Sequence, residues 1–408
     1  MALIDTSFVG LSSTSPLPLS SMGTSNAILT ASFYIFNFLS TATTPLVAEQ
    51  NSVSPNLAKA TAGQALSLSI LLGSILSFLL IIFSSPLLHM VSATAPTTLS
   101  LPFLQIRALA APAILLSSAS IGILRGYLDT STPLRIIAFA NVVNLMIDYV
   151  TINVLHLSST GAAIATTSAE YVAAISFLSH LKNNRKITPL TNLPSLSTIS
   201  PLLSSSLSLF LRTITLQSIF LSATYFASAF ASTPEVAISN VAAHQVALQL
   251  WFVCSFTSDA LAVAASGLVA SEKNEEGKNE VAKTVVGLGL VLGIAQSTIL
   301  YLLIHGGLFE LFTNDPATLS LLRQIEPILV LCQPINSVSY VLDGVVQGRG
   351  EFKFQAKAMA VCAGVAGLWF CGSSLADSGG EQVLLHVWEG LAVLMGARLA
   401  ASVFKLKS

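Results

Sequence analysis

The chain has 408 residues, of which 53% are hydrophobic and only 9% are charged, and its formal net charge is −1. A soluble domain carries about 25% charged residues, so this composition excludes a water-soluble globular protein and indicates one embedded in a lipid bilayer. The nearly neutral charge leaves no basic footprint for nucleic acid, and no nucleic-acid partner is expected. The four cysteines have the spacing of neither a disulfide framework nor a zinc site, so no metal or cofactor is expected.

Twelve apolar segments follow one another along the chain. Each is predicted to be a helix, because strands of a membrane barrel would be about 10 residues long with strict alternation. The first segment, residues 1–11, has about half of the ~20 residues that a spanning helix needs, so we expect a truncated first helix or a segment that does not span. The others are residues 22–48, 61–84, 98–124, 133–155, 161–181, 201–232, 236–270, 284–312, 317–346, 352–373 and 382–404.

The longest polar interruption divides these segments into two sets of six. Residues 182–200 hold three basic residues and two prolines and are predicted to be a linker. The prediction is therefore a six-helix lobe over residues 1–181 and a second over residues 201–408. Fourteen of the 18 Lys and Arg residues fall in loops, or at the carboxyl end, on one side of the membrane. The positive-inside rule places both termini on that cytoplasmic-equivalent side.

An internal repeat relates the two lobes. Leu46-Val47-Ala48 recurs as Leu268-Val269-Ala270, at residue numbers that differ by 222. Pro112 and Pro334 differ by the same 222, as do Gly126 and Gly348, and Asp129 corresponds to Glu351. Six helices are an even number, so both halves enter the membrane in the same sense and form parallel repeats. Transporters built in this way bind substrate near the midplane of the bilayer.

Polar residues inside the fifth segment are the first candidate site. Asn144 and Asp148 are four residues apart and share one helix face, which Asn141 extends. A carboxylate in an apolar helix is costly, and such residues usually face a bundle interior or a wet cavity and serve transport. The functional interpretation is a cation or proton site, and the structural alternative is hydrogen bonding between helices.

The second lobe offers three further candidates. Asp259 lies in the middle of the eighth segment, and Asp343 lies near the inner end of the tenth. Arg212, in the seventh segment, either pairs with one of these acids or snorkels to the nearby interface, and snorkelling is favoured.

Six motifs of the chain resemble the MATE (multidrug and toxic compound extrusion) family, and the similarity runs from residue 1 to about residue 400. The motifs are residues 5–10 (DTSFVG), 43–48 (TTPLVA), 124–134 (LRGYLDTSTPL), 161–166 (GAAIAT), 242–245 (AAHQ) and 342–344 (LDG). The pattern is most similar to the DinF-type branch, which includes plastid members. The resemblance implies two six-helix lobes, with Asp5 as the coupling carboxylate and Asn144, Asp148 and Thr166 as its partners. The short first helix would leave Asp5 near a ragged end, and the seventh segment lacks the glutamate of other eukaryotic branches.

Together these features predict a secondary antiporter that exports an organic substrate (a drug, metabolite or organic acid) in exchange for H+ or Na+. We expect a monomer, in a plastid envelope or alternatively in a plasma or other membrane. The alternative is a lipid or glycolipid flippase, which is expected to hold more cationic residues in its cavity than Arg212 alone. No enzyme is expected, because the chain has neither H-E-x-x-H nor G-x-S-x-G, and the absence of G-x-x-x-x-G-K-S/T disfavours ATP drive.

Overall fold

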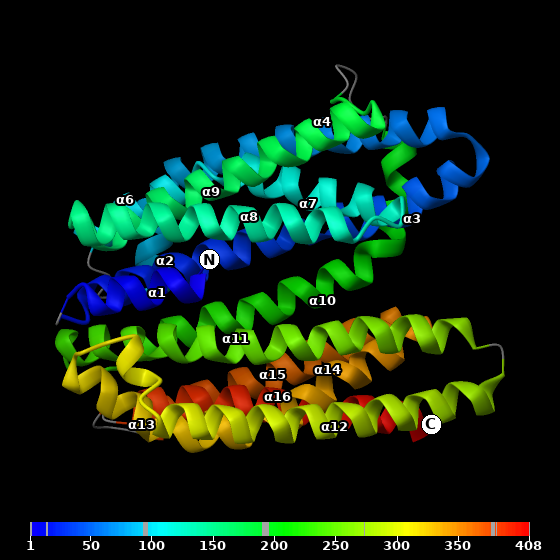
Figure 1. Ribbon diagram of the computed structural model, residues 1–408. Coiled ribbons are helices and arrows are strands. Elements are labelled where there is room, and N and C mark those ends of the chain that lie inside the picture. Colours follow the sequence, from blue (N-terminus) through cyan, green and yellow to red (C-terminus); the bar gives the residue numbers. More distant parts are fainter. Residues whose placement is uncertain are drawn as a thin grey trace. The chain divides into compact units, whose positions relative to one another are not determined.

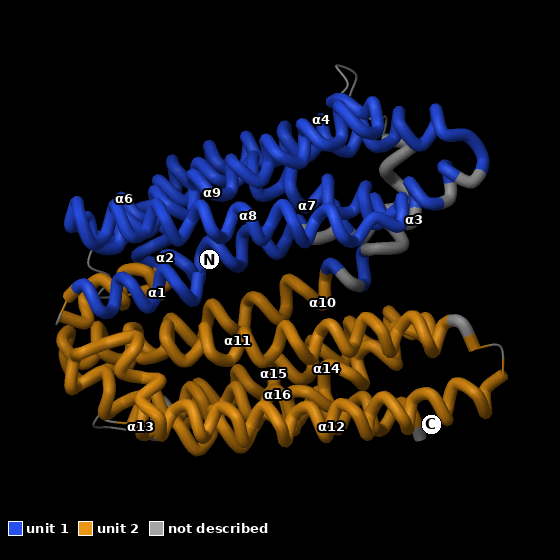
Figure 2. The backbone as a smooth tube through the Cα atoms, viewed as in Figure 1, with its two compact units in different colours: residues 1–12, 25–90, 96–210 blue, residues 13–24, 91–95, 211–408 orange. Residues whose placement is uncertain are grey.

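The computed structural model describes residues 2–13, 15–92, 97–189, 196–272, 274–376, 380 and 382–407, and every regular element within these ranges is a helix (Figure 1). The chain divides into two compact units (Figure 2). Unit 1 comprises Met1–Ser12, Ser25–Met90 and Pro96–Phe210, and unit 2 comprises Ser13–Thr24, Val91–Ala95 and Leu211–Ser408. Part of the predicted linker, residues 190–195, lies outside the described residues, and a helix already begins at Leu196.

The helices follow the predicted apolar segments closely. In the first half they are α1 (Ala2–Leu11), α2 (Leu17–Tyr34), η1 (Ile35–Asn37), α3 (Phe38–Val53), α4 (Pro55–Ile82), α5 (Ser84–Val91), α6 (Thr97–Ala108), α7 (Ala111–Gly126), α8 (Ser131–Asp148), η2 (Tyr149–Val154), α9 (Ser158–His180) and η3 (Leu181–Arg185). In the second half they are α10 (Leu196–Ala229), α11 (Pro234–Ser271), α12 (Glu275–His305), η4 (Phe309–Leu311), α13 (Pro316–Leu331), α14 (Gln333–Gly348), α15 (Phe352–Ala376) and α16 (Val383–Lys407).

Length and hydropathy confirm a multi-pass membrane protein. Among the described residues, seven helices are long and apolar enough to cross a membrane, and the number rises to nine if each of two bent helix pairs is one span. α1 is a shorter apolar helix. Large apolar side chains point outward along these helices, among them Phe78, Val291 and Leu368, which are 64%, 65% and 75% exposed. Such surfaces suit contact with lipid and confirm the predicted all-α, polytopic class.

In each bent pair, the second helix has a proline in its first turn. α6 and α7 meet at 44°, and α13 and α14 meet at 48°. Pro112 and Pro334 are the second residues of α7 and α14. A proline lacks an N–H and its ring clashes with the carbonyl four residues earlier, so it is tolerated in the first turn of a helix but interrupts a continuous one. Pro112 and Pro334 are therefore suited to starting a new helix after each break, whereas Pro102 and Pro327 lie inside α6 and α13.

The same contacts recur in both units at the predicted offset of 222. A Cβ on Gly126 would lie 2.8 Å from Val47 Cβ, and a Cβ on Gly348 would lie 2.8 Å from Val269 Cβ. Each glycine lets its helix approach a neighbour closely: α7 packs on α3, and α14 packs on α11. Helices in lipid associate largely through such close packing of small residues. The repeat read from the sequence is thus also a repeat of packing.

The corner between α7 and α8 is built differently from a glycine turn. Gly126 is still helical, and the residue with positive φ is Leu128, at 60°. The Asp129 N–H closes the end of α7 by donating to the Leu124 carbonyl at 2.9 Å, and the Asp129 carboxylate accepts from Thr132 N at 3.0 Å. In the second half, the residue 222 positions after Leu128 is Gly350, whose φ is 76°. The left-handed position is therefore the shared feature, and only the second copy has the residue that adopts it without strain.

Candidate functional site

Four polar side chains from three helices meet inside unit 1. Asn144 Nδ2 donates to Asp5 Oδ1 at 3.2 Å and to Asp148 Oδ2 at 2.5 Å. Thr166 Oγ1 lies 2.6 Å from Asp5 Oδ2. All four residues are buried, and none is more than 4% exposed. The structure therefore brings together Asp5 of α1, Asn144 and Asp148 of α8 and Thr166 of α9, the four residues that the family resemblance grouped. We name them the acidic cluster.

Local structure explains how α8 presents two of these groups. Asn144 and Asp148 are one turn apart, so their side chains lie on the same face of the helix. Asp148 is the last α-helical residue, and the π-helical turn η2 begins at Tyr149. Short π-helical turns are frequently found at functional sites. The buried face of α8 also includes Pro133 and Ala140, so the polar pair continues the face that packs inside the unit.

The hydrogen bonds leave acceptor capacity unused. Asn144 Oδ1 and Asp148 Oδ1 are both buried and have no hydrogen-bond partner among the described residues. The two carboxylates accept from the same nitrogen, Asn144 Nδ2. The distance between Asp5 Oδ1 and Asp148 Oδ2 therefore cannot exceed the sum of the two hydrogen-bond lengths. Two close carboxylates resist simultaneous ionisation unless a proton or another cation lies with them. The arrangement can therefore hold a monovalent cation or a shared proton.

Thr166 has two acceptors for one proton. Its hydroxyl lies 2.6 Å from Asp5 Oδ2 and 2.9 Å from the carbonyl of Ala162, one turn earlier in α9. A hydroxyl donates a single hydrogen, so it serves one acceptor at a time and can also accept through its lone pairs. Contact with Asp5 and bonding to its own helix are therefore both present in the geometry.

Two ionisable residues near this cluster were missed from the sequence. Arg107 of α6 and Glu170 of α9 interact electrostatically with each other and with Asp5. Arg107 Nη1 is buried and has no hydrogen-bond partner among the described residues. Glu170 follows Thr166 by four residues, and this spacing alone would have placed both on one face of α9.

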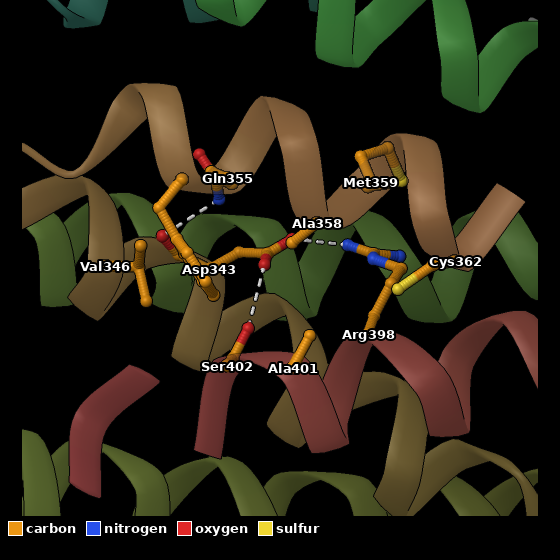
Figure 3. A pocket seen from close by; sticks show the side chains of 10 residues that line it. Asp343, Val346, Gln355, Ala358, Met359, Cys362, Arg398, Ala401 and Ser402 are labelled. Carbon is orange, nitrogen blue, oxygen red and sulfur yellow. Dashed lines mark hydrogen bonds and ion pairs between the residues drawn. The ribbon is translucent and has the colours of Figure 1, made fainter. Parts of the chain in front are cut away.

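A second polar cluster lies inside unit 2 around Asp343 of α14. Asp343 Oδ2 accepts from Arg212 Nη2 of α10 at 2.5 Å and from Arg398 Nη2 of α16 at 2.6 Å. Ser402 Oγ lies 3.5 Å from Asp343 Oδ1, and Gln355 Nε2 donates to the Asp343 carbonyl at 3.3 Å (Figure 3). Arg398 also lies over the Tyr340 ring, 5.0 Å from its centroid. We name Arg212, Asp343 and Arg398 the arginine pair site.

This geometry corrects one expectation from the sequence. Arg212 was expected to snorkel to the interface, but its side chain is 16% exposed and forms an ion pair with Asp343. Arg398, which is 2% exposed, was overlooked because it lies within an apolar run near the carboxyl end. Asp259 lies on an exposed face of α11, and the contacts of Asp343 do not include it. Of the two acids proposed in the second lobe, only Asp343 is therefore part of a buried ionic cluster.

The two clusters do not occupy equivalent places in the repeat. The residues 222 positions after Asp5, Asn144, Asp148 and Thr166 are Ala227, Ala366, Phe370 and Trp388. All four are buried, with at most 1% exposed. Conversely, the residues 222 positions before Asp343 and Arg398 are Ile121 and Ser176. Each unit therefore buries ionic groups where the other has apolar or small side chains.

Fold and site together define the class as an all-α, multi-pass membrane protein with two units of repeated packing and buried ionic clusters in each. A family model described as MatE matches residues 1–150 and 208–371. The chain belongs to the MatE family, and the predicted resemblance is confirmed.

Relatives and solved structures agree with this assignment. The chain is 33% identical to Protein DETOXIFICATION 43 of Arabidopsis thaliana over 84% of this chain and 64% of that protein. It is 30% identical to Protein DETOXIFICATION 44, chloroplastic, of the same plant over 99% of this chain and 78% of that protein. It is 29% identical to DNA damage-inducible protein F of Escherichia coli (strain K12) over 43% and 38% of the two chains. The chain thus spans somewhat less than two thirds of the length of the first of these relatives.

Solved structures confirm the fold. An inward-facing conformation of a multidrug resistance MATE family transporter of the MOP superfamily superposes with a TM-score of 0.81 and 18% identity, over 99% of this chain and 92% of that chain. A crystal structure of MATE in the straight conformation gives a TM-score of 0.69 and 19% identity, over 99% and 94% of the two chains.

Proposed function

We propose that the protein is a secondary antiporter that exports an organic molecule, a drug, metabolite or organic acid, in exchange for H+ or Na+. The acidic cluster of unit 1 is the coupling site in this proposal. The observation that carries it is the pair of buried acids, Asp5 and Asp148, which both accept from the Asn144 amide. Asn144 Oδ1 and Asp148 Oδ1 have no hydrogen-bond partner among the described residues. Relatives named for detoxification and a solved multidrug resistance transporter of the same fold support export as the direction of transport.

The cluster couples through charge. When a cation or proton is bound, the two carboxylates and their amide partner are compensated and the contacts between α1, α8 and α9 are favourable. When the cation leaves, the two acids repel each other and the contacts between these helices weaken. A transporter needs such a difference, because an ion drives a conformational change only through differential interaction with the two states. Asp5 on α1 and Asp148 on α8 are the residues whose repulsion supplies it.

The test is gradient-driven flux by the full chain in proteoliposomes. An imposed proton gradient and an imposed sodium gradient are applied in separate arms, with ethidium and succinate as cationic and anionic probes. We expect one gradient to drive at least one probe, and Asp148→Asn to reduce that flux to the level of empty liposomes. Asp129→Asn is the matched control, because it makes the same chemical change at a partly exposed residue just before α8, outside the acidic cluster, where an Asn side chain can also accept from Thr132 N.

Two results would count against this proposal. Equal gradient-driven flux in Asp148→Asn and wild type would remove Asp148 from coupling. Flux of neither probe under either gradient, with folded protein in the bilayer, would remove antiport of these two classes of molecule. The chloroplastic relative makes a plastid membrane the proposed location, which a fluorescent fusion of the complete gene product would test.

A lipid or glycolipid flippase remains the second candidate, and one observation now favours it more than the sequence did. The sequence offered only Arg212 as a buried cation, whereas the structure adds Arg398 and the largely buried Arg107. Cationic side chains inside a membrane protein suit anionic head groups. Transfer of a fluorescent anionic phospholipid between leaflets of the same proteoliposomes, without an ion gradient, would favour the flippase over the antiporter.

A further inference from the structure

The arginine pair site of unit 2 carries more positive than negative charge. Asp343 accepts from both arginines through the same oxygen, Oδ2, at 2.5 and 2.6 Å. One carboxylate balances one guanidinium, so the three side chains have a formal charge of +1. Among the described residues, Arg398 interacts with Asp343, Tyr340, Cys362 and Met395. Asp343 is the one acid in this set. An excess charge away from water is costly unless an opposite charge accompanies it.

Donors of the two arginines remain unused. Nε of Arg212 and Nε of Arg398 are buried and have no hydrogen-bond partner among the described residues. Nη1 of Arg398 points to the thioether sulfur of Met395 at 3.0 Å, and a thioether is only a weak acceptor. A guanidinium has five N–H groups and is always charged, so these positions call for a strong acceptor.

A small cavity lies against Arg398. It is lined mainly by side chains of α15 and α16, including Gln355, Met359, Cys362 and Ser402, and Figure 3 shows the Arg398 guanidinium between these two helices. The room inside is close to that of one water molecule. One lining group, Gln355, donates through Nε2 to the Asp343 carbonyl, and its Oε1 has no hydrogen-bond partner among the described residues.

We infer that the arginine pair site binds one halide-sized monovalent anion at the unused donors of Arg398 beside Asp343. The positive excess selects an anion over a cation or water. The small room excludes bulky or multiply charged anions. Asp343 orients both guanidinium groups and limits affinity by neutralising half of their charge. The site shares no residue and no helix with the acidic cluster, because its residues lie on α10, α14 and α16.

Anion binding by the purified full chain in nanodiscs tests this inference. One measurement is binding of radiolabelled chloride, and the other is the thermal unfolding midpoint, read from tryptophan fluorescence as chloride, acetate or succinate replaces a bulky sulfonate at constant ionic strength. A ligand of the native state raises the midpoint in a saturable way. We expect chloride to do so with one ion per chain, and the larger acetate and succinate to have no such effect. A response to chloride alone supports a halide-sized site, and a response to acetate without one to chloride would overturn the inference.

Two variants give opposite expected results. Arg398→Gln removes the excess charge and should abolish the response. Asp343→Asn raises the formal charge from +1 to +2 and should tighten binding, by about tenfold or more at buried-site dielectric values. Arg323→Gln is the control: it removes an arginine of the same unit that is exposed and paired with Glu310, and should respond as wild type does.

A merely structural ion cluster would not give this pattern. The inference fails if chloride has no effect beyond that of the sulfonate, if Arg398→Gln responds as wild type, or if Asp343→Asn binds chloride no more tightly than wild type. If Arg398→Gln does not fold, Arg212→Gln replaces it, because it also reduces the formal charge to zero and leaves Arg398 paired with Asp343.

Discussion

Replacing Gly293 with alanine should destabilise unit 2 at the break between α13 and α14. A Cβ at this position would lie 2.5 Å from Pro334 Cα and 2.9 Å from the Gln333 carbonyl oxygen. Both are backbone atoms, so no side chain can turn away and the backbone itself must move. Overpacking of this kind typically costs about 1–3 kcal/mol.

The matched control is Gly287→Ala, at an earlier position in the same helix, α12. A Cβ there meets no atom within 4 Å. Alanine in a helix interior gains about 1 kcal/mol over glycine at either position, so that gain cancels when the two variants are compared. The expected difference in unfolding free energy is therefore the clash alone, about 1–3 kcal/mol.

The assay is the thermal unfolding midpoint of each variant in the same detergent. One kcal/mol moves the midpoint by about 2–4 °C for a domain of 150–250 residues, so Gly293→Ala should unfold measurably below Gly287→Ala. Gly73→Ala should behave like Gly293→Ala, because its Cβ would lie 2.5 Å from Pro112 Cα in unit 1. Equal midpoints for Gly293→Ala and Gly287→Ala would refute the close approach of α12 to the start of α14.

Two further outcomes test the buried clusters. Thr166→Val should lower gradient-driven flux while Thr166→Ser retains it, because only serine keeps the hydroxyl that reaches Asp5; equal flux in both would remove that hydroxyl from coupling. Asp343→Asn should destabilise the protein by about 3–5 kcal/mol in anion-free buffer, since it leaves two arginines without a counter-charge. Arg212→Gln should lower the unfolding free energy by less, because the remaining pair is neutral. Denaturant unfolding of both variants measures this, and an equal or larger loss in Arg212→Gln would contradict the role of charge balance.

Much of the fold follows from hydropathy and from the repeat. Every predicted apolar segment coincides with a helix or helix pair, because apolar length is what the bilayer selects. The breaks near Pro112 and Pro334 and the close packing at Gly126 and Gly348 were not predicted, although these residues were visible as pairs at a fixed offset. The role of Gly126 could not be read from the sequence, because a glycine that lets helices approach and a glycine that permits positive φ look alike in a single sequence.

The site was less accessible to sequence reasoning. Asn144 and Asp148 share a helix face by spacing, but only the family resemblance linked them to Asp5 and Thr166, which lie on other helices. Arg398 and Glu170 were missed because each sits alone in an apolar run, and no local spacing shows which distant residue it will face. The pairing of Arg212 with Asp343 likewise depends on how α10, α14 and α16 pack, which is a property of the bundle and not of any one segment.

The apolar residues at the equivalents of the acidic cluster have a consequence for stoichiometry. Duplication of the scaffold kept the glycine contacts in both copies, but Phe370 and Trp388 now fill the positions that Asp148 and Thr166 occupy in the first copy. A second ion site of the same kind cannot form there without removing two buried rings. If unit 1 couples transport, the part of the chain that the structure describes therefore offers one such site, and the steepest substrate gradient that transport can sustain is set by the ions that this site carries.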